Sequence, residues 1–133
     1  MCELIKELER ITPDLPPIPN IIQYREEIDN RTIYRFNGGI VTSENLHSEE
    51  AIAIAKIFIH KGVTFERHVH PFSYEWLIIL RGSLILSFDD SKDILLNVYD
   101  SINIDINKPH SAYAVEDTTI IAITIPKDDG FPK

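Results

Sequence analysis

The sequence predicts an all-β fold, an antiparallel sandwich or barrel formed by one domain. Its 133 residues match the usual size of a single domain. From residue 51 onward, short runs rich in β-branched and aromatic residues alternate with turn residues, and no helical segment separates them. Closely spaced short strands of this kind are typical of sandwiches and barrels, and not of α/β folds.

The N-terminal residues 3–11 predict a short amphipathic helix, because four apolar side chains fall on one helical face. These side chains are Leu4, Ile5, Leu8 and Ile11. Four prolines between residues 13 and 19 then predict an extended connector, since proline fixes φ and has no amide donor. The helix could pack on its own domain or reach a second subunit. We therefore divide the chain into helix and connector (1–20), β-domain (21–125) and polar tail (126–133).

Strands are expected through most of the β-domain. They are residues 21–24, 31–36, 51–60, 64–70, 75–80, 83–88, 94–98, 101–106, 112–115 and 118–125. Residues 42–50 are rich in polar side chains and are expected to form a loop. Alternation along the later strands places apolar side chains, or their immediate neighbours, in the core. These are Leu77, Ile79, Leu84, Leu86, Ile102, Ile104, Ile121 and Ile123.

Charge and composition disfavour several classes of function. The formal net charge is −8 and the pI is near 5.0, which argues against binding to nucleic acid or to anionic membranes. The longest apolar runs are far shorter than the about 20 residues of a membrane span. The single cysteine, Cys2, cannot form an intrachain disulfide, and the acidic start is unlike a signal peptide. We therefore expect a cytoplasmic protein without nucleic-acid or membrane partners.

A group of histidines and one carboxylate predicts a metal site. His68 and His70 are two residues apart in an expected strand, so both side chains lie on one face. Glu75 follows after a turn, and His110 stands just before a later strand. Three imidazoles and one carboxylate can hold a divalent metal and leave positions open for substrate or oxygen. The pair of histidines alone is a weak signal, and the wider spacing carries the prediction.

That spacing resembles the first motif of the cupin superfamily. Gly62, five residues, His68, one residue, His70, four residues, Glu75, six residues and Gly82 match every fixed position of the motif. The two glycines are expected at strand ends, where a positive φ or close packing is needed. The resemblance covers roughly residues 50–125.

The second cupin motif is largely absent. It usually reads Gly, five residues, Pro, one residue, Gly, two residues, His, three residues, Asn. Only His110 stands at its expected position, and Asp100, Ile106, Lys108 and Ala114 replace the other four residues. The departure affects the turn before His110 and leaves the histidine itself in place.

The resemblance implies a small double-stranded antiparallel β-barrel of the jelly-roll type, with the metal site inside it. The implied metal ligands are His68, His70, Glu75 and His110. The implied cofactor is one divalent transition metal, and the same ligands suit iron, manganese, nickel, zinc or copper.

Four further residues are expected around the metal. Thr64 and Glu66 share strand parity with His68, and Ala112 and Ala114 share parity with His110. Glu66 could accept a hydrogen bond from an imidazole or act as a general base, although a carboxylate near a strand end more often lies in water. The small alanines would leave room for a ligand. No Arg or Lys is expected in the pocket, which disfavours a phosphate-bearing substrate.

These expectations lead to two main functional hypotheses. The first is a metal-dependent enzyme acting on a small metabolite, either a dioxygenase or an isomerase or lyase, with an oxygenase favoured. The second is a non-catalytic module that binds a small molecule or a metal. A structural barrel with incidental histidines ranks below both. A homodimer is expected because short barrels leave sheet edges that a second subunit can cover, and Tyr74 and Trp76, opposite in parity to Glu75, could lie in its interface.

Overall fold

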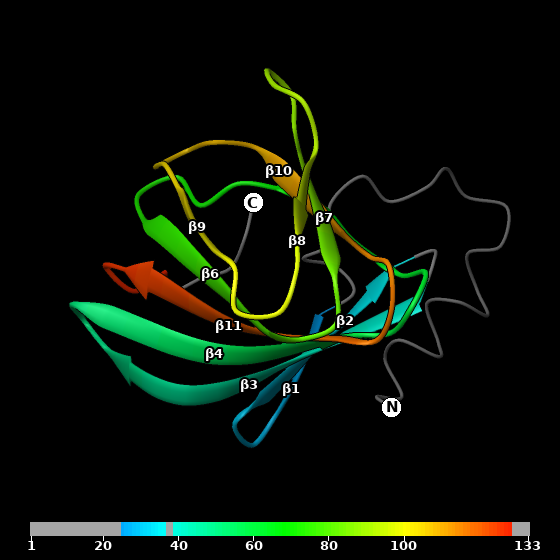
Figure 1. Ribbon diagram of the computed structural model, residues 1–133. Coiled ribbons are helices and arrows are strands. Elements are labelled where there is room, and N and C mark those ends of the chain that lie inside the picture. The colour runs from blue at the N-terminus through cyan, green and yellow to red at the C-terminus, as the bar shows by residue number, and fades with distance from the viewer. Residues whose placement is uncertain (1–24, 37–38, 129–133) are drawn as a thin grey trace, which may run out of the picture.

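The computed structural model describes residues 25–36 and 39–128, and within them the chain forms strands and no helix (Figure 1). The strands are β1 (Arg25–Ile28), β2 (Arg31–Phe36), β3 (Gly39–Glu49), β4 (Ile52–Ile59), β5 (Thr64–His68), β6 (Tyr74–Arg81), β7 (Leu84–Phe88), β8 (Ile94–Leu96), β9 (Ser101–Ile104), β10 (His110–Ala114) and β11 (Thr118–Ile125). The predicted helix, the proline connector and the predicted strand at 21–24 lie outside the described residues.

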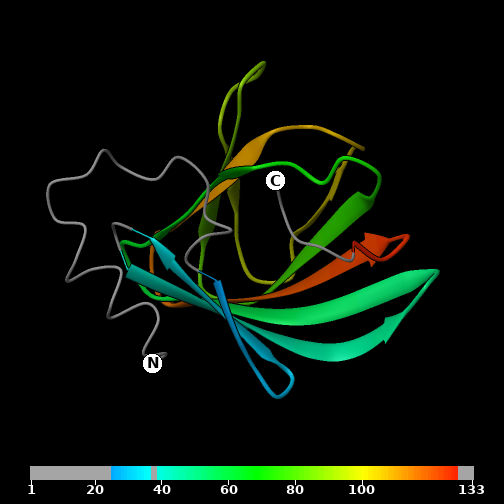
Figure 2. The ribbon, with the colours of Figure 1, turned by 180° about the vertical axis from the view of Figure 1, so that it is seen from behind.

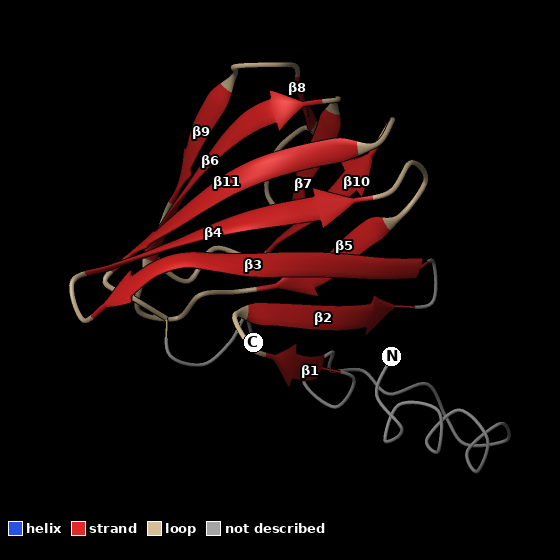
Figure 3. Cartoon of the chain, turned by 90° about the horizontal axis from the view of Figure 1, so that it is seen from below, coloured by secondary structure: helices blue, strands red, loops and turns tan. Residues whose placement is uncertain are grey.

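The strands form two antiparallel sheets. The larger has the order β1-β2-β3-β4-β11-β6-β9 and the smaller the order β5-β10-β7-β8. Seen from below, the smaller sheet lies behind the larger one (Figure 3), and the view from behind shows the same two layers (Figure 2). The all-β prediction is confirmed, but the prediction of a closed barrel is wrong. Among the described strands, none of one sheet pairs with a strand of the other, so no continuous ladder closes the structure.

The core lies between the two sheets. Ile59, Ile79, Leu84, Leu86 and Ile104 are almost completely buried there, as the alternation along β6 and β7 predicts. On β11 the buried residues are the parity neighbours of those named in the sequence analysis. Ile120 and Ala122 face the core there, in place of Ile121 and Ile123.

The polar segment 42–50 is not the loop that the sequence predicts, because residues through Glu49 belong to β3. β3 pairs with β2 on one side and with β4 on the other, so ladder hydrogen bonds hold it along most of its length. Val41 is fully buried, whereas the residues from Asn45 onward are exposed. A strand with water near both faces lacks the apolar alternation that reveals other strands.

A β-bulge in β5 changes which side chains face the interior. Ala112 of β10 is opposite Phe65, but His110, two residues earlier, is opposite His68, three residues later. The extra residue on β5 reverses the alternation, so Phe65 and His68 are both buried. The strand also ends at His68, so the prediction that His70 belongs to a strand over residues 64–70 is wrong, and His70 lies in the segment that follows.

Gly82 lies in the tight turn between β6 and β7. Its φ is +88°, a value that favours glycine. A Cβ atom there would collide with the carbonyl oxygen of Asp117 and lie 2.6 Å from Thr118 Oγ1. This glycine of the first motif therefore has a structural role.

Candidate metal centre

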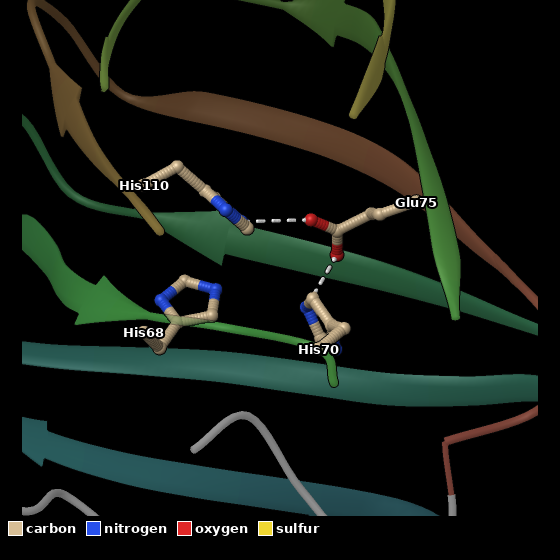
Figure 4. Close-up of side chains that lie close together, drawn as sticks. All are labelled: His68, His70, Glu75 and His110. Atoms are coloured by element: carbon tan, nitrogen blue, oxygen red, sulfur yellow. Dashed lines mark hydrogen bonds and ion pairs between the residues drawn. The ribbon is translucent and has the colours of Figure 1, made fainter. Parts of the chain in front are cut away.

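The four predicted metal ligands come together in the interior (Figure 4). His68, His70, Glu75 and His110 are all buried, and one potential ligand atom from each lies within 4.8 Å of the others. His68 ends β5 and His110 begins β10, where the two residues are opposite each other. Glu75 comes from β6 of the larger sheet, and His70 from the segment between β5 and β6. The cluster therefore lies where the two sheets meet.

Backbone carbonyls orient two of the three imidazoles. Nδ1 of His68 is 2.6 Å from the carbonyl oxygen of Glu66, and Nδ1 of His110 is 2.8 Å from the carbonyl oxygen of Lys108. A carbonyl oxygen can only accept a hydrogen bond, so the proton of a neutral ring lies on Nδ1. Nε2 then carries the free electron pair that a metal requires.

Carboxylates lie at both nitrogens of His70. Nδ1 is 2.7 Å from Oδ2 of Asp128, and Nε2 is 3.2 Å from Oε2 of Glu75. Nε2 is nevertheless buried without a hydrogen bond. The other oxygen of Glu75, Oε1, is 3.0 Å from Nε2 of His110. Glu75 therefore lies between two imidazoles.

The environment shifts the pKa values of three of these groups in different directions. Burial would raise the pKa of Glu75, but the charge of His70 and the close polar contact with His110 hold it well below its usual value. Burial would lower the pKa of His70, but Glu75 and Asp128 raise it to about 10. Burial, followed by the charge of His110, lowers the pKa of His68 to about 3. Without a metal, an anionic Glu75 thus lies beside a protonated His70 and a neutral His68.

This arrangement fits a divalent transition metal. Ligands at about 2.0–2.2 Å from a common ion lie at most about 4.4 Å apart, so the cluster needs only a small contraction. Three imidazole nitrogens and one carboxylate oxygen suit iron, manganese, nickel, zinc and copper. Nε2 of His70, buried and without a hydrogen bond, has the position of a ligand atom. The proton on His70 supplies the positive charge that an ion would replace.

A cavity of about 360 Å³ extends from the cluster along the inner face of the larger sheet. Its floor is made of short side chains that pair across β4 and β11, Ala53 with Thr124 and Ala55 with Ala122. Polar side chains from β2 and β3 line its outer part: Thr32, Ser43, Asn45 and Ser48. The volume is within the range of small-molecule sites, about 300–1,000 Å³.

Of the four additional residues expected around the metal, the structure places one at the cavity and three away from it. Ala112 lines the cavity. Ala114 is fully buried in the apolar core and does not line it. Thr64 and Glu66 do not line the cavity either, because the bulge in β5 turns Phe65 inward. Glu66 still contributes to the cluster, through its backbone carbonyl and not through its carboxylate.

Sequence reasoning missed the contribution of the C-terminal segment. Lys127 and Asp128 line the cavity, although residues 126–133 were expected to be a polar tail and no lysine was expected in the pocket. Asp128 is 58 residues from His70, and no local pattern links the two. Tyr34 also lines the cavity, with its ring 5.2 Å from that of Phe65.

Comparison with known proteins agrees with the resemblance seen in the motif. The sequence pattern of the Cupin domain family matches residues 56–126, just over half of the chain. The chain is a cupin. The match includes all four residues of the cluster and the strands that carry them. No curated protein sequence matches this cupin.

Solved structures show the same fold at low sequence identity. KdgF from Halomonas sp. is 14% identical with a TM-score of 0.64, over 79% of this cupin and 89% of that chain. An RmlC-like cupin from Shewanella frigidimarina is 18% identical with a TM-score of 0.61, over 77% and 83% of the two chains. Ectoine synthase from P. lautus is 11% identical with a TM-score of 0.61, over 70% and 75%. In the described part of this cupin, no helix is long and apolar enough to cross a membrane.

Proposed function

We propose that this cupin binds one divalent transition metal through His68, His70, Glu75 and His110 and uses it to transform a small metabolite. The observation that supports the proposal is the buried cluster at the inner end of a cavity of small-molecule size. The metal would supply Lewis-acid or oxygen-activating chemistry. An oxygenase is the favoured kind of metal-dependent enzyme, and an isomerase or lyase is the alternative.

The chain's own residues would bind and orient the substrate. The short floor side chains leave room for it beside the cluster. Apolar and hydroxyl-bearing side chains both line the cavity, which suits a small molecule of mixed polarity. Ectoine synthase, a named enzyme, has the same fold, which supports a catalytic role for such a domain.

A non-catalytic binding module is the second candidate, and one observation favours it. The metal would use all three imidazoles and Glu75, and Asp128 is engaged with His70. Among the described residues that line the cavity, the other ionisable side chains are Glu27, Tyr34 and Lys127. Few groups therefore remain that could move a proton to or from a substrate.

Metal analysis tests the shared core of both candidates. Protein purified without a nickel column should contain close to one transition metal per chain, and His68→Ala and His110→Ala should lose it. His47→Ala and His60→Ala are matched controls, because both histidines are exposed and outside the cluster. Metal retained in the cluster variants would refute the proposed site. Oxygen uptake and turnover screens on the loaded protein then distinguish enzyme from module.

The homodimer and the cytoplasmic location stay predictions. The described structure leaves β1 and β9 at the edges of one sheet and β5 and β8 at the edges of the other, which supports association through an edge. Light scattering at high micromolar concentration should give the mass of two chains. A monomer mass under those conditions would refute the dimer.

A further inference from the structure

The three imidazoles of the cluster are held at Nδ1 by different kinds of partner. His68 and His110 each contact a backbone carbonyl two residues earlier in the chain. The carbonyl of Glu66 belongs to β5 and that of Lys108 to the segment just before β10, and neither carries a net charge. His70 instead contacts the carboxylate of Asp128 at 2.7 Å, and both side chains are largely buried, with 8% and 17% of their surface exposed. The orientation of His70 therefore depends on a separate, charged residue.

The fold delivers Asp128 to this position in two steps. β11 pairs with β6 so that Thr124 is opposite Glu75, which brings the end of β11 beside the cluster. The amide of Lys127 then donates a hydrogen bond of 3.2 Å to the carbonyl oxygen of Glu50, in the turn between β3 and β4. The segment after β11 is thus attached to the larger sheet, and Asp128 follows directly after this attachment.

We propose that Asp128 is a positioning residue for the metal centre, which orients His70 and strengthens it as a ligand. The inference rests on the proposed metal site. A carboxylate that accepts the Nδ1 proton fixes the ring with Nε2 toward the metal and makes that nitrogen a better electron donor. A neutral carbonyl, as at His68 and His110, orients the ring but adds no charge. Asp128 would thus set the metal affinity of the whole site without touching the metal.

Metal affinity of Asp128 variants tests this inference. Zn²⁺ or Co²⁺ is titrated into metal-free protein in competition with a chelating dye. Asp128→Ala should weaken binding about 10–100-fold, the usual cost of losing such a partner. Asp128→Asn keeps an acceptor oxygen and loses only the charge, so its affinity should lie between those of Asp128→Ala and the wild type. Asp117→Asn is the matched control, because Asp117 is a carboxylate 3.8 Å from His60, outside the cluster.

The outcomes separate the inference from the proposed function. If the wild-type protein binds neither ion at one per chain, the metal site itself is refuted and the role of Asp128 with it. If the wild type binds the metal and both Asp128 variants bind it as tightly as the wild type, only the role of Asp128 is refuted. The absorption spectrum of the Co²⁺ form and the melting temperature of the metal-free form accompany each titration. A variant that melts earlier but keeps its metal affinity would show that Asp128 only attaches the C-terminal segment, which also refutes the inference.

Discussion

The two faces of the seven-stranded sheet differ sharply, although the same strands form both. On the inner face of β6 and β11, Glu75 and Thr124 are opposite each other at the cluster. On the outer face of the same strands, Trp76 is opposite Ile123 and Tyr74 is opposite Ile125. Of the two inner side chains at the cluster, Glu75 is ionisable and Thr124 is short, whereas Trp76 and Tyr74 are large and 45% and 46% exposed.

This difference shows how one strand can serve two purposes. Alternation sends successive residues of β6 to opposite faces, so a site residue and a surface aromatic are chain neighbours. The space for a ligand exists because the residues of β4 and β11 nearest the cluster, Ala53, Ala55, Ala122 and Thr124, have short side chains. Substitutions at neighbouring positions should therefore have effects of different kind and size.

The largest effect is expected from a pair of neighbours on β6. Glu75→Gln removes the only anionic ligand of the cluster and should weaken metal binding more than about 100-fold, beyond the usual cost of losing an outer partner. Trp76→Ala, one residue away on the outer face, should leave the metal affinity unchanged. Competition titrations with Zn²⁺ on both variants provide the measurement. Similar metal affinities in the two variants would mean that the metal does not bind on the inner face of the sheet, where Glu75 lies.

Substitution of two alanines, one in the packed core and one at the cavity, compares how much room each place leaves for a larger side chain. Ala114→Phe places a large ring where the structure is fully packed and should cost about 1–3 kcal/mol in the free energy of unfolding. Ala122→Phe directs the same ring into the cavity floor and should cost less, while hindering small molecules from reaching the metal. Urea unfolding of both variants measures the difference. Equal losses of stability would argue that the cavity is closed in solution.

The pH dependence of stability should reflect the protonation of the ionisable side chains in the interior cluster. In metal-free protein, the raised pKa of His70 contributes stability that is complete below about 6.5 and is lost as the pH rises toward about 10. The lowered pKa of His68 acts in the other direction, since stability is lost as the pH falls from about 6.5 toward 3. Glu75, with its lowered pKa, adds to the acid loss.

The melting temperature of chelator-treated protein should therefore be highest near pH 6.5 and fall on both sides, on the order of several degrees. His70→Gln should flatten the alkaline side of this profile, and His68→Gln the acid side. His47→Gln, at an exposed position, is the control and should leave the profile unchanged. A profile that His70→Gln does not alter would show that His70 is not protonated in the folded, metal-free protein.

The four residues of the cluster could be predicted from sequence because their spacing resembles the motifs of the cupin superfamily. His68, His70 and Glu75 come from one motif, and His110 stands at the one preserved position of the second. Parity from His110 also identified Ala112 as a cavity residue. The fold class followed in the same way from short runs of strand-forming residues.

The rest could not be predicted because it depends on geometry that the sequence pattern does not carry. Parity failed for Thr64 and Glu66 because a bulge inserts one residue into β5, and no residue type marks that position. β3 was missed because its polar residues lack an apolar face. Asp128 reaches His70, 58 residues away in the chain, through the pairing of β11 with β6 and the hydrogen bond between Lys127 and Glu50.

The smallest effect is expected at the surface next to the bulge. Arg67 lies between Glu66 and His68, and its guanidinium makes a bidentate contact with Asp89. The hydrogen bond from Arg67 lowers the pKa of Asp89, and Asp89 raises that of Arg67. Both side chains are more than half exposed, and exposed ion pairs contribute little to stability.

Arg67→Ala should therefore leave both the melting temperature and the metal affinity close to those of the wild type, measured at low and at high salt. The backbone bonds of β5 with β10, and not the surface pair, would then fix the bulge and with it His68. A loss of metal affinity as large as that expected for Asp128→Ala would reverse this conclusion. The bulge would then depend on a side-chain contact on the solvent side, and the metal centre would be supported from both faces of β5.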